Sequence, residues 1–123
     1  MSDTIEILWK KTPQEHDYPA AESYLSLIYD GTLVERFINL FKQAPVRTFK
    51  AKDIFRASGL SLLGVSNSHV EKDRNKIKDK KALSPLLLVR DTTNGKVIIA
   101  DGYHRLCAVY SIDEDALIAC CIV

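Results

Sequence analysis

Residues 97–110 read VIIADGYHRLCAVY. The first four are an uninterrupted apolar run, which is typical of a buried strand, whereas Leu106 and Tyr110 recur at the spacing of one helix face. Asp101 and Gly102 lie between the two patterns, and a glycine there lets the backbone turn sharply. The sequence therefore predicts a strand, a tight loop and a helix in direct succession.

The segments around this loop predict a small sheet. A second apolar run at 86–89 is separated from the run at 97–100 by turn residues, so the two are expected to pair as a hairpin. The apolar run at 117–123 is expected to be a third strand. Because a helix joins it to the strand at 97–100, we expect these two strands to lie parallel. A charged helix is predicted before the hairpin, from about 69 to 81.

The N-terminal half has a different pattern and predicts three helices between residue 19 and about residue 58. They are expected to end at Asp30-Gly31, at Pro45 and at Gly59, residues that stop helices. With a length of 123 residues, we expect one domain of mixed α/β (α+β) class. In this interpretation residues 1–65 are a helical extension, and residues 66–123 form the core.

Composition and charge limit the class of protein. Hydrophobic residues make up 46% and charged residues 27% of the chain, and the net charge is +1, which is typical of a soluble globular protein. This charge provides no overall field that would attract nucleic acid or an anionic membrane. No apolar run approaches the roughly 20 residues of a membrane-spanning helix, and Met1–Glu6 lacks the pattern of a secretory signal. We therefore expect a cytoplasmic protein without membrane contact.

The three cysteines are expected to be buried thiols rather than a disulfide. Cys120 and Cys121 are neighbours in a predicted strand, so they should face opposite sides of the sheet. The chain has no CxxC motif and no Cys/His spacing typical of zinc. The sequence predicts no structural metal site.

The loop at 101–105 has the chemistry of an anion site. The first turn of a helix leaves backbone N–H groups free, and these groups attract anions. His104 and Arg105 lie in this turn, where a cation is unfavourable to the helix dipole and needs a compensating negative charge. A bound phosphate can supply that charge, and so can Asp101 if it caps the helix and pairs with Arg105. The residue types alone leave both readings open.

The charged helix before the hairpin offers further cations. Residues His69, Lys72 and Lys76 share one helical face and are expected to reach phosphate oxygens together. The alternative is that this face is simply solvated.

The order of these segments resembles the core of the ParB/sulfiredoxin superfamily over roughly residues 68–123. In that superfamily a helix leads into a proline-containing strand, a hairpin, and a Gly-X-His-Arg loop that opens a helix. The matching residues here are Gly102, Tyr103, His104 and Arg105. The resemblance implies a phosphate-binding loop at these four residues, which relatives use for ATP, ADP or CTP. Magnesium is expected only with a nucleoside polyphosphate.

Departures from the superfamily narrow the expected activity. Sulfiredoxins carry their catalytic cysteine where this chain has Tyr103, so repair of sulfinic acid is not expected. Partitioning ParB proteins continue into a helix-turn-helix domain, whereas this sequence ends at Val123. Some free-standing relatives phosphorylate a small hydroxyl compound with a carboxylate from the upstream helix. Glu71 and Asp73 are the candidates here, together with Asp101 in the loop, and His104 would donate a proton.

Two other interpretations remain at this stage. In the first, the chain is a non-catalytic interaction protein whose phosphate loop is only structural, and the sequence does not identify a protein partner. In the second, residues 52–60 begin a helix-turn-helix that binds DNA, because a glycine followed by an apolar residue occurs in such turns. This second pattern is weak.

Overall fold

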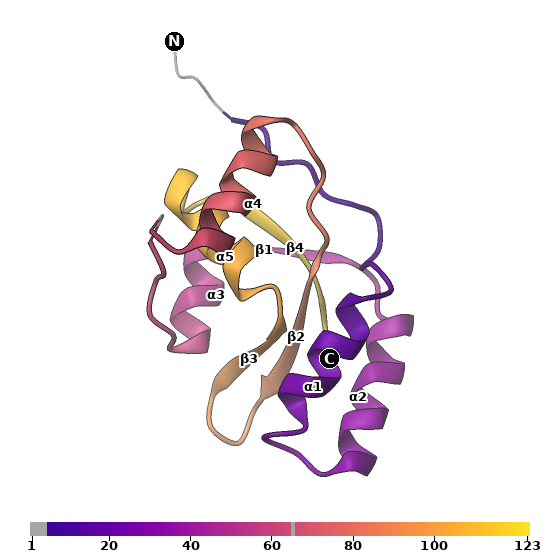
Figure 1. Cartoon of the computed structure of the whole chain (residues 1–123). Helices are drawn as coiled ribbons and strands as arrows, with labels where there is room; N and C mark the ends of the chain where they lie inside the picture. Colours follow the sequence, from indigo (N-terminus) through magenta and orange to yellow (C-terminus); the bar gives the residue numbers. More distant parts are fainter. Residues whose placement is uncertain (1–4, 65) are drawn as a thin grey trace.

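The computed structural model describes residues 5–64 and 66–123, which form a mixed α/β fold as predicted (Figure 1). Residues 1–4, part of the segment that lacks a secretory signal pattern, lie outside the described residues. The helices are α1 (Asp17–Leu25), α2 (Gly31–Gln43), α3 (Ala51–Ser58), α4 (Ser68–Lys78) and α5 (Tyr103–Ile112). The strands are β1 (Arg47–Lys50), β2 (Leu86–Asp91), β3 (Lys96–Asp101) and β4 (Leu117–Ile122), in the sheet order β1-β4-β2-β3.

The predicted orientation of β4 is wrong: it was expected to lie parallel to β3, but it runs antiparallel to β3. β2 and β3 form the expected antiparallel hairpin, but β4 pairs in parallel with β2, not with β3. After β3 the chain passes through α5 and enters β4 on the far side of β2, at the end of the sheet where β2 also begins, so β4 is parallel to β2. The register Leu87 to Asp101 and Leu86 to Cys120 fixes this arrangement. The loop after Asp101 therefore lies at the carboxyl end of β3 and near the amino end of β2.

β1 was not predicted, because the N-terminal half was interpreted as wholly helical. Its four residues, Arg47–Lys50, pair antiparallel with β4 at the edge of the sheet, and all four are exposed. A strand without a buried face has no alternation of apolar and polar residues, so the sequence carried no period-2 signal. The charged residues at its two ends suit an edge position.

Helices cover both faces of the sheet. Leu86 and Leu88 pack in one core with residues of α3, α4 and α5, whereas Leu87 and Val89 pack in a second core with residues of α1 and α2. Figure 1 shows these two groups of helices on either side of β2. The apolar run at 86–89 is thus buried on both faces, as predicted. Of the three helices in the N-terminal half, α1 and α2 cover one face of the sheet, whereas α3 lies with α4 and α5 on the other.

The extent of α4 differs from the prediction, whereas the cysteines are as predicted. α4 ends at Lys78, earlier than predicted, and Lys80 has a left-handed backbone with φ of 57°. Cys120 and Cys121 belong to opposite cores, and both are buried free thiols, as predicted. Burial raises the pKa of Cys120 to about 12, so this thiol is unreactive at neutral pH. No helix in the described part of the chain is long and apolar enough to span a membrane.

Candidate functional site

A cavity of about 160 Å³ opens where β3 passes into α5, and we call it the loop cavity. The loop and α5 contribute Asp101, Gly102, His104 and Arg105, and α4 contributes His69, Lys72, Asp73 and Lys76. Eight of the ten candidate residues from the sequence are in this set; Glu71 and Tyr103 are not. The structure therefore brings the predicted loop and the predicted basic helix face together.

Gly102 shapes the bend between β3 and α5. Its φ is 105°, a conformation that other L-residues rarely adopt. A Cβ atom there would lie 2.6 Å from Leu86 Cγ and 2.9 Å from a terminal nitrogen of Arg105. Gly102 is the N-cap residue of α5, and no side chain caps this helix. The capping role considered for Asp101 is therefore not observed, and the helix N-terminus faces the cavity without a side-chain acceptor.

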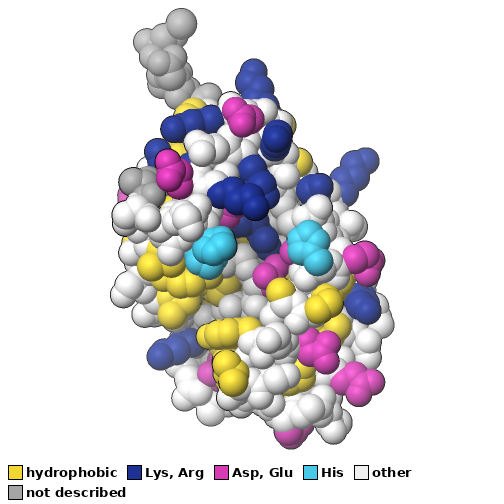
Figure 2. Space-filling view, viewed as in Figure 1, with side chains coloured by type: hydrophobic (Ala, Val, Ile, Leu, Met, Phe, Trp, Pro, Cys, Tyr) yellow, Lys and Arg dark blue, Asp and Glu magenta, His cyan; other side chains and the backbone are white. Residues whose placement is uncertain are grey.

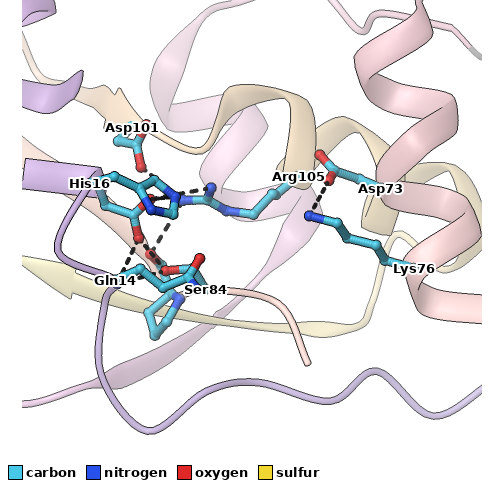
Figure 3. A network of polar contacts seen from close by, with 9 residues as sticks. Gln14, His16, Asp73, Lys76, Ser84, Asp101 and Arg105 are labelled. Atoms are coloured by element: carbon cyan, nitrogen blue, oxygen red, sulfur yellow. Dashed lines mark hydrogen bonds and ion pairs between the residues drawn. The ribbon is translucent and has the colours of Figure 1, made fainter. Parts of the chain in front are cut away.

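Arg105 lies between two carboxylates, and its side chain is only 16% exposed. Its Nη2 donates to Asp101 Oδ2 at 3.0 Å and to the Pro85 carbonyl at 3.4 Å, and its Nη1 lies 3.9 Å from Asp17 Oδ1 (Figure 3). Its Nε is buried and has no hydrogen-bond partner among the described residues. The pairing of Asp101 with Arg105 is thus present, but it does not satisfy the whole guanidinium.

Asp17 is the second carboxylate, and sequence reasoning missed it. It is 2% exposed at the start of α1 and accepts hydrogen bonds from the Gln14 backbone at 2.9 Å and from the Ser84 hydroxyl. Nothing near Asp17 in the sequence marks it as part of the loop site, because only the packing of α1 on the sheet brings it there. Ser84 donates its hydroxyl proton to Asp17, so it is not poised as a nucleophile.

The two carboxylates affect each other. Burial raises the pKa of Asp101 above its ordinary value and Asp17 raises it further, while Arg105 acts in the opposite direction without cancelling the rise. Asp101 is therefore protonated more readily than an exposed aspartate, and Arg105 is the cation that keeps the two acidic groups together.

His104 stands at the centre of an aromatic group. Its ring centroid is 4.8 Å from that of His69 and 5.9 Å from that of Tyr103, whose ring is nearly parallel at 22°. Burial lowers the pKa of His104 below its ordinary value; His69 and Arg105 lower it further, and Asp73 partly offsets them. His104 is therefore neutral at pH 7 and would gain a proton more easily beside a bound anion.

The α4 wall of the loop cavity carries the excess positive charge. Lys76 Nζ lies 3.9 Å from Asp73 Oδ1, whereas no ion pair is found for Lys72 among the described residues. Figure 2 shows Lys and Arg side chains gathered between two histidine positions on this face of the molecule. Asp101 offsets the charge of Arg105 and Asp73 offsets part of the charge of Lys76, so Lys72 and the α5 N-terminus contribute most of the remaining attraction for an anion.

A larger cavity of about 420 Å³ adjoins the first, and we call it the arm cavity. It shares Asp73, Lys76 and Arg105 with the loop cavity, and its far wall is the segment before α1, including Lys10 and His16. That segment is held by backbone hydrogen bonds of 2.8 Å from Lys10 N to Leu83 O and from Leu83 N to Leu8 O. The basic surface therefore continues beyond the loop onto the N-terminal segment.

The two predicted residues outside the loop cavity have other surroundings. Glu71 is exposed on α4, and Asp73 is the upstream carboxylate that lies in the cavity. Asp73 follows His69 by four residues and precedes Lys76 by three, so helical spacing alone would have favoured it over Glu71. The Tyr103 hydroxyl donates to the Ser61 carbonyl, and its ring lines a different cavity.

Neither a metal site nor a similar protein identifies the ligand of this cavity. In residues 5–64 and 66–123, no group of three or more His, Cys, Asp or Glu side chains could hold a metal ion. The chain matches no protein-family model, and no curated protein or solved structure is significantly similar to it.

Proposed function

We propose that this protein is a ParB/sulfiredoxin-like domain that binds a phosphate-bearing small molecule in the loop cavity. The observation that carries the proposal is that Lys72, Lys76 and the N-terminus of α5 all line one cavity. No side chain caps this N-terminus. Free helix N–H groups and lysine ammonium groups are both favourable partners for phosphate oxygens. The superfamily resemblance adds the expectation that the phosphate belongs to a nucleotide.

Each loop residue has a role in this proposal. Gly102 allows the close approach of the phosphate, and the N–H groups from Tyr103 onward donate to it. Arg105 contributes its charge from the cavity wall while Asp101 fixes its orientation. His104 donates a hydrogen bond or a proton, and the His69 ring packs beside it in the cavity wall.

The first prediction concerns the two lysines of α4. Lys72→Gln and Lys76→Gln should each weaken binding of inorganic phosphate or sulfate by about tenfold, because each removes a charge-assisted contact. Binding is measured by NMR titration of the ¹⁵N-labelled protein. Lys78→Gln is the matched control, since Lys78 is an exposed lysine of the same helix outside the cavity. Equal affinities for all three variants and the parent protein would contradict the proposed site.

The second prediction concerns pH. Sulfate keeps its charge between pH 5.5 and 8, so its affinity reports the protein alone. Because the pKa of His104 is lowered in the free protein and a bound anion would raise it, sulfate should bind more tightly as pH falls. Each unit by which binding raises this pKa corresponds to about tenfold in affinity at the acidic limit. Calorimetry in two buffers should detect proton uptake.

His104→Asn should flatten this pH dependence, whereas His16→Asn should preserve it, because His16 lies outside the loop cavity. The free protein should show the opposite trend in stability. A histidine with a lowered pKa in the folded state is protonated more readily when unfolded, so its contribution to stability is lost as pH falls below the ordinary histidine value. Sulfate affinity that does not change with pH would remove His104 from the anion site.

Phosphotransfer is a second candidate function, and the position of Asp73 favours it. Asp73 is buried in the wall of the loop cavity, where a carboxylate could act as general base on a hydroxyl acceptor. Magnesium can be held by one or two carboxylates together with nucleotide phosphates, and Asp73 is free of Arg105, unlike Asp101. Screening ATP, ADP and CTP with and without magnesium, with ³¹P NMR to detect turnover, separates binding from catalysis. Tight binding without turnover would assign a non-catalytic role.

DNA binding receives little support from the arrangement of α3 and α4. These helices are joined by residues 59–67, which is longer than the 3–4-residue turn of a helix-turn-helix. In addition, the basic face of α4 lines the loop cavity, and α4 packs in the same core as α5. Lys72 and Lys76, the α4 lysines that line this cavity, support a small anion as the partner.

A further inference from the structure

We propose that the phosphate-bearing ligand carries a planar aromatic group next to its phosphate, and that this group binds beside Tyr24, Leu60 and Tyr103. The inference rests on the proposed function and deepens it by naming the class of ligand. The site is a cavity of about 350 Å³, which we call the tyrosine cavity. It shares no lining residue with the arm cavity.

The tyrosine cavity adjoins the loop cavity. Both are lined by Asp101, Gly102 and His104. A phosphate held at the α5 N-terminus is therefore close to both spaces, and the rest of the ligand can extend from one into the other. The backbone at Gly102 forms the common wall and has no side chain to separate them.

The lining of the tyrosine cavity suits an apolar, flat group. Apart from the shared residues it consists of Tyr24, Leu60, Ile99, Ala100 and Tyr103. The arm cavity, in contrast, is lined by lysines, histidine and other polar side chains. Of the two spaces that adjoin the phosphate site, one therefore favours further anionic groups and the other favours an aromatic ring.

The aromatic wall is held in place before any ligand arrives. The Tyr103 hydroxyl donates to the Ser61 carbonyl, and the Tyr103 ring is nearly parallel to that of His104. Fixed rings lose little conformational freedom on binding, and offset stacking favours a planar partner over an aliphatic one. The wall is therefore suited to stacking.

The outer wall leaves apolar surface uncovered. Tyr24 is 43% exposed and Leu60 is 42% exposed, and Figure 2 shows hydrophobic side chains gathered below the histidine on the left. A bound ring would cover this surface. The volume is sufficient, since a cavity of about 150 Å³ holds benzene.

Three phosphate monoesters test the inference by NMR titration: methyl phosphate, cyclohexyl phosphate and phenyl phosphate. Phenyl phosphate should bind roughly tenfold more tightly than methyl phosphate, in line with the value of stacking one ring on an aromatic side chain. Cyclohexyl phosphate should fall between them. Tyr24→Ala and Leu60→Ala should each reduce the advantage of phenyl phosphate and leave the affinity for methyl phosphate unchanged.

Leu27→Ala is the matched control, because Leu27 is 84% exposed, near Tyr24 in the chain, and outside the cavity. Nuclear Overhauser contacts from the phenyl protons to the Leu60 methyl groups provide a readout in the unsubstituted protein. If no ester binds, the proposed function fails and this inference with it. Equal affinities for all three esters would overturn the aromatic site but leave the proposed phosphate site intact. The same conclusion would follow if phenyl phosphate still bound more tightly than methyl phosphate in both the Tyr24→Ala and the Leu60→Ala variants.

Discussion

Arg105→Met should lower the free energy of unfolding by about 3–5 kcal/mol, the cost of removing one partner from a buried ion pair. Arg105 is the cation between Asp17 and Asp101, and methionine would fill its volume without its charge. The loss should be largest at pH 8 and smaller at pH 5. Without Arg105 the pKa of Asp101, already raised by burial, would rise further. A raised pKa in the folded state gives stability that is lost as pH increases. Urea denaturation at both pH values measures the effect.

A second substitution checks the cause of this loss. Asp17→Asn combined with Arg105→Met should recover part of the stability, because it removes one of the uncompensated carboxylates. Arg36→Met, at an exposed arginine of α2, should change stability by no more than about 0.5 kcal/mol. A double variant that is less stable than Arg105→Met alone would show that the two carboxylates are not held by this guanidinium.

Gly102→Ala should lower the free energy of unfolding by about 2–4 kcal/mol, through a strained left-handed backbone and an overpacked neighbour. The added Cβ would lie 2.6 Å from Leu86 Cγ, and Leu86 is fully buried and cannot move away easily. The other close atom, a terminal nitrogen of Arg105 at 2.9 Å, would have to leave its contact with Asp101. The substitution should therefore also weaken sulfate binding.

Gly31→Ala is the control for this prediction. Gly31 is the first residue of α2, and a Cβ atom there would meet nothing within 4 Å. Alanine is also the better helix former, by up to about 1 kcal/mol. Gly31→Ala should therefore leave stability unchanged or raise it slightly. Similar unfolding curves for both alanine variants would show that the bend at residue 102 tolerates a side chain.

The hairpin, the loop and α5 could be predicted because their signals are local. Apolar runs, a glycine between strand and helix, and helical spacing in α4 and α5 are all features of neighbouring residues. Helical spacing also predicted that His69, Lys72 and Lys76 share a face, and all three line the loop cavity. Asp73, one of the two upstream carboxylates that the sequence offered, belongs to the same face and also lines the cavity.

The remaining features depend on contacts between distant parts of the chain. β1 has no buried face, so it forms only because β4 offers an open edge. The pairing of β4 with β2 is decided by which edge of the hairpin α5 passes. Asp17 reaches Arg105 because α1 packs against the sheet. No periodicity within a short window can reveal such partners.

The shared position of Arg105 has a consequence for how the molecule responds to a ligand. Asp17 belongs to the N-terminal layer and competes with any incoming anion for the same guanidinium. An anion that draws Arg105 toward itself would weaken the ion pair between Arg105 and Asp17 of α1. Because thermodynamic coupling is reciprocal, a stronger ion pair with Asp17 would in turn lower the affinity for the anion. If an anion binds the loop as proposed, its occupancy would be communicated to the helices on the opposite face of the sheet through Arg105 alone.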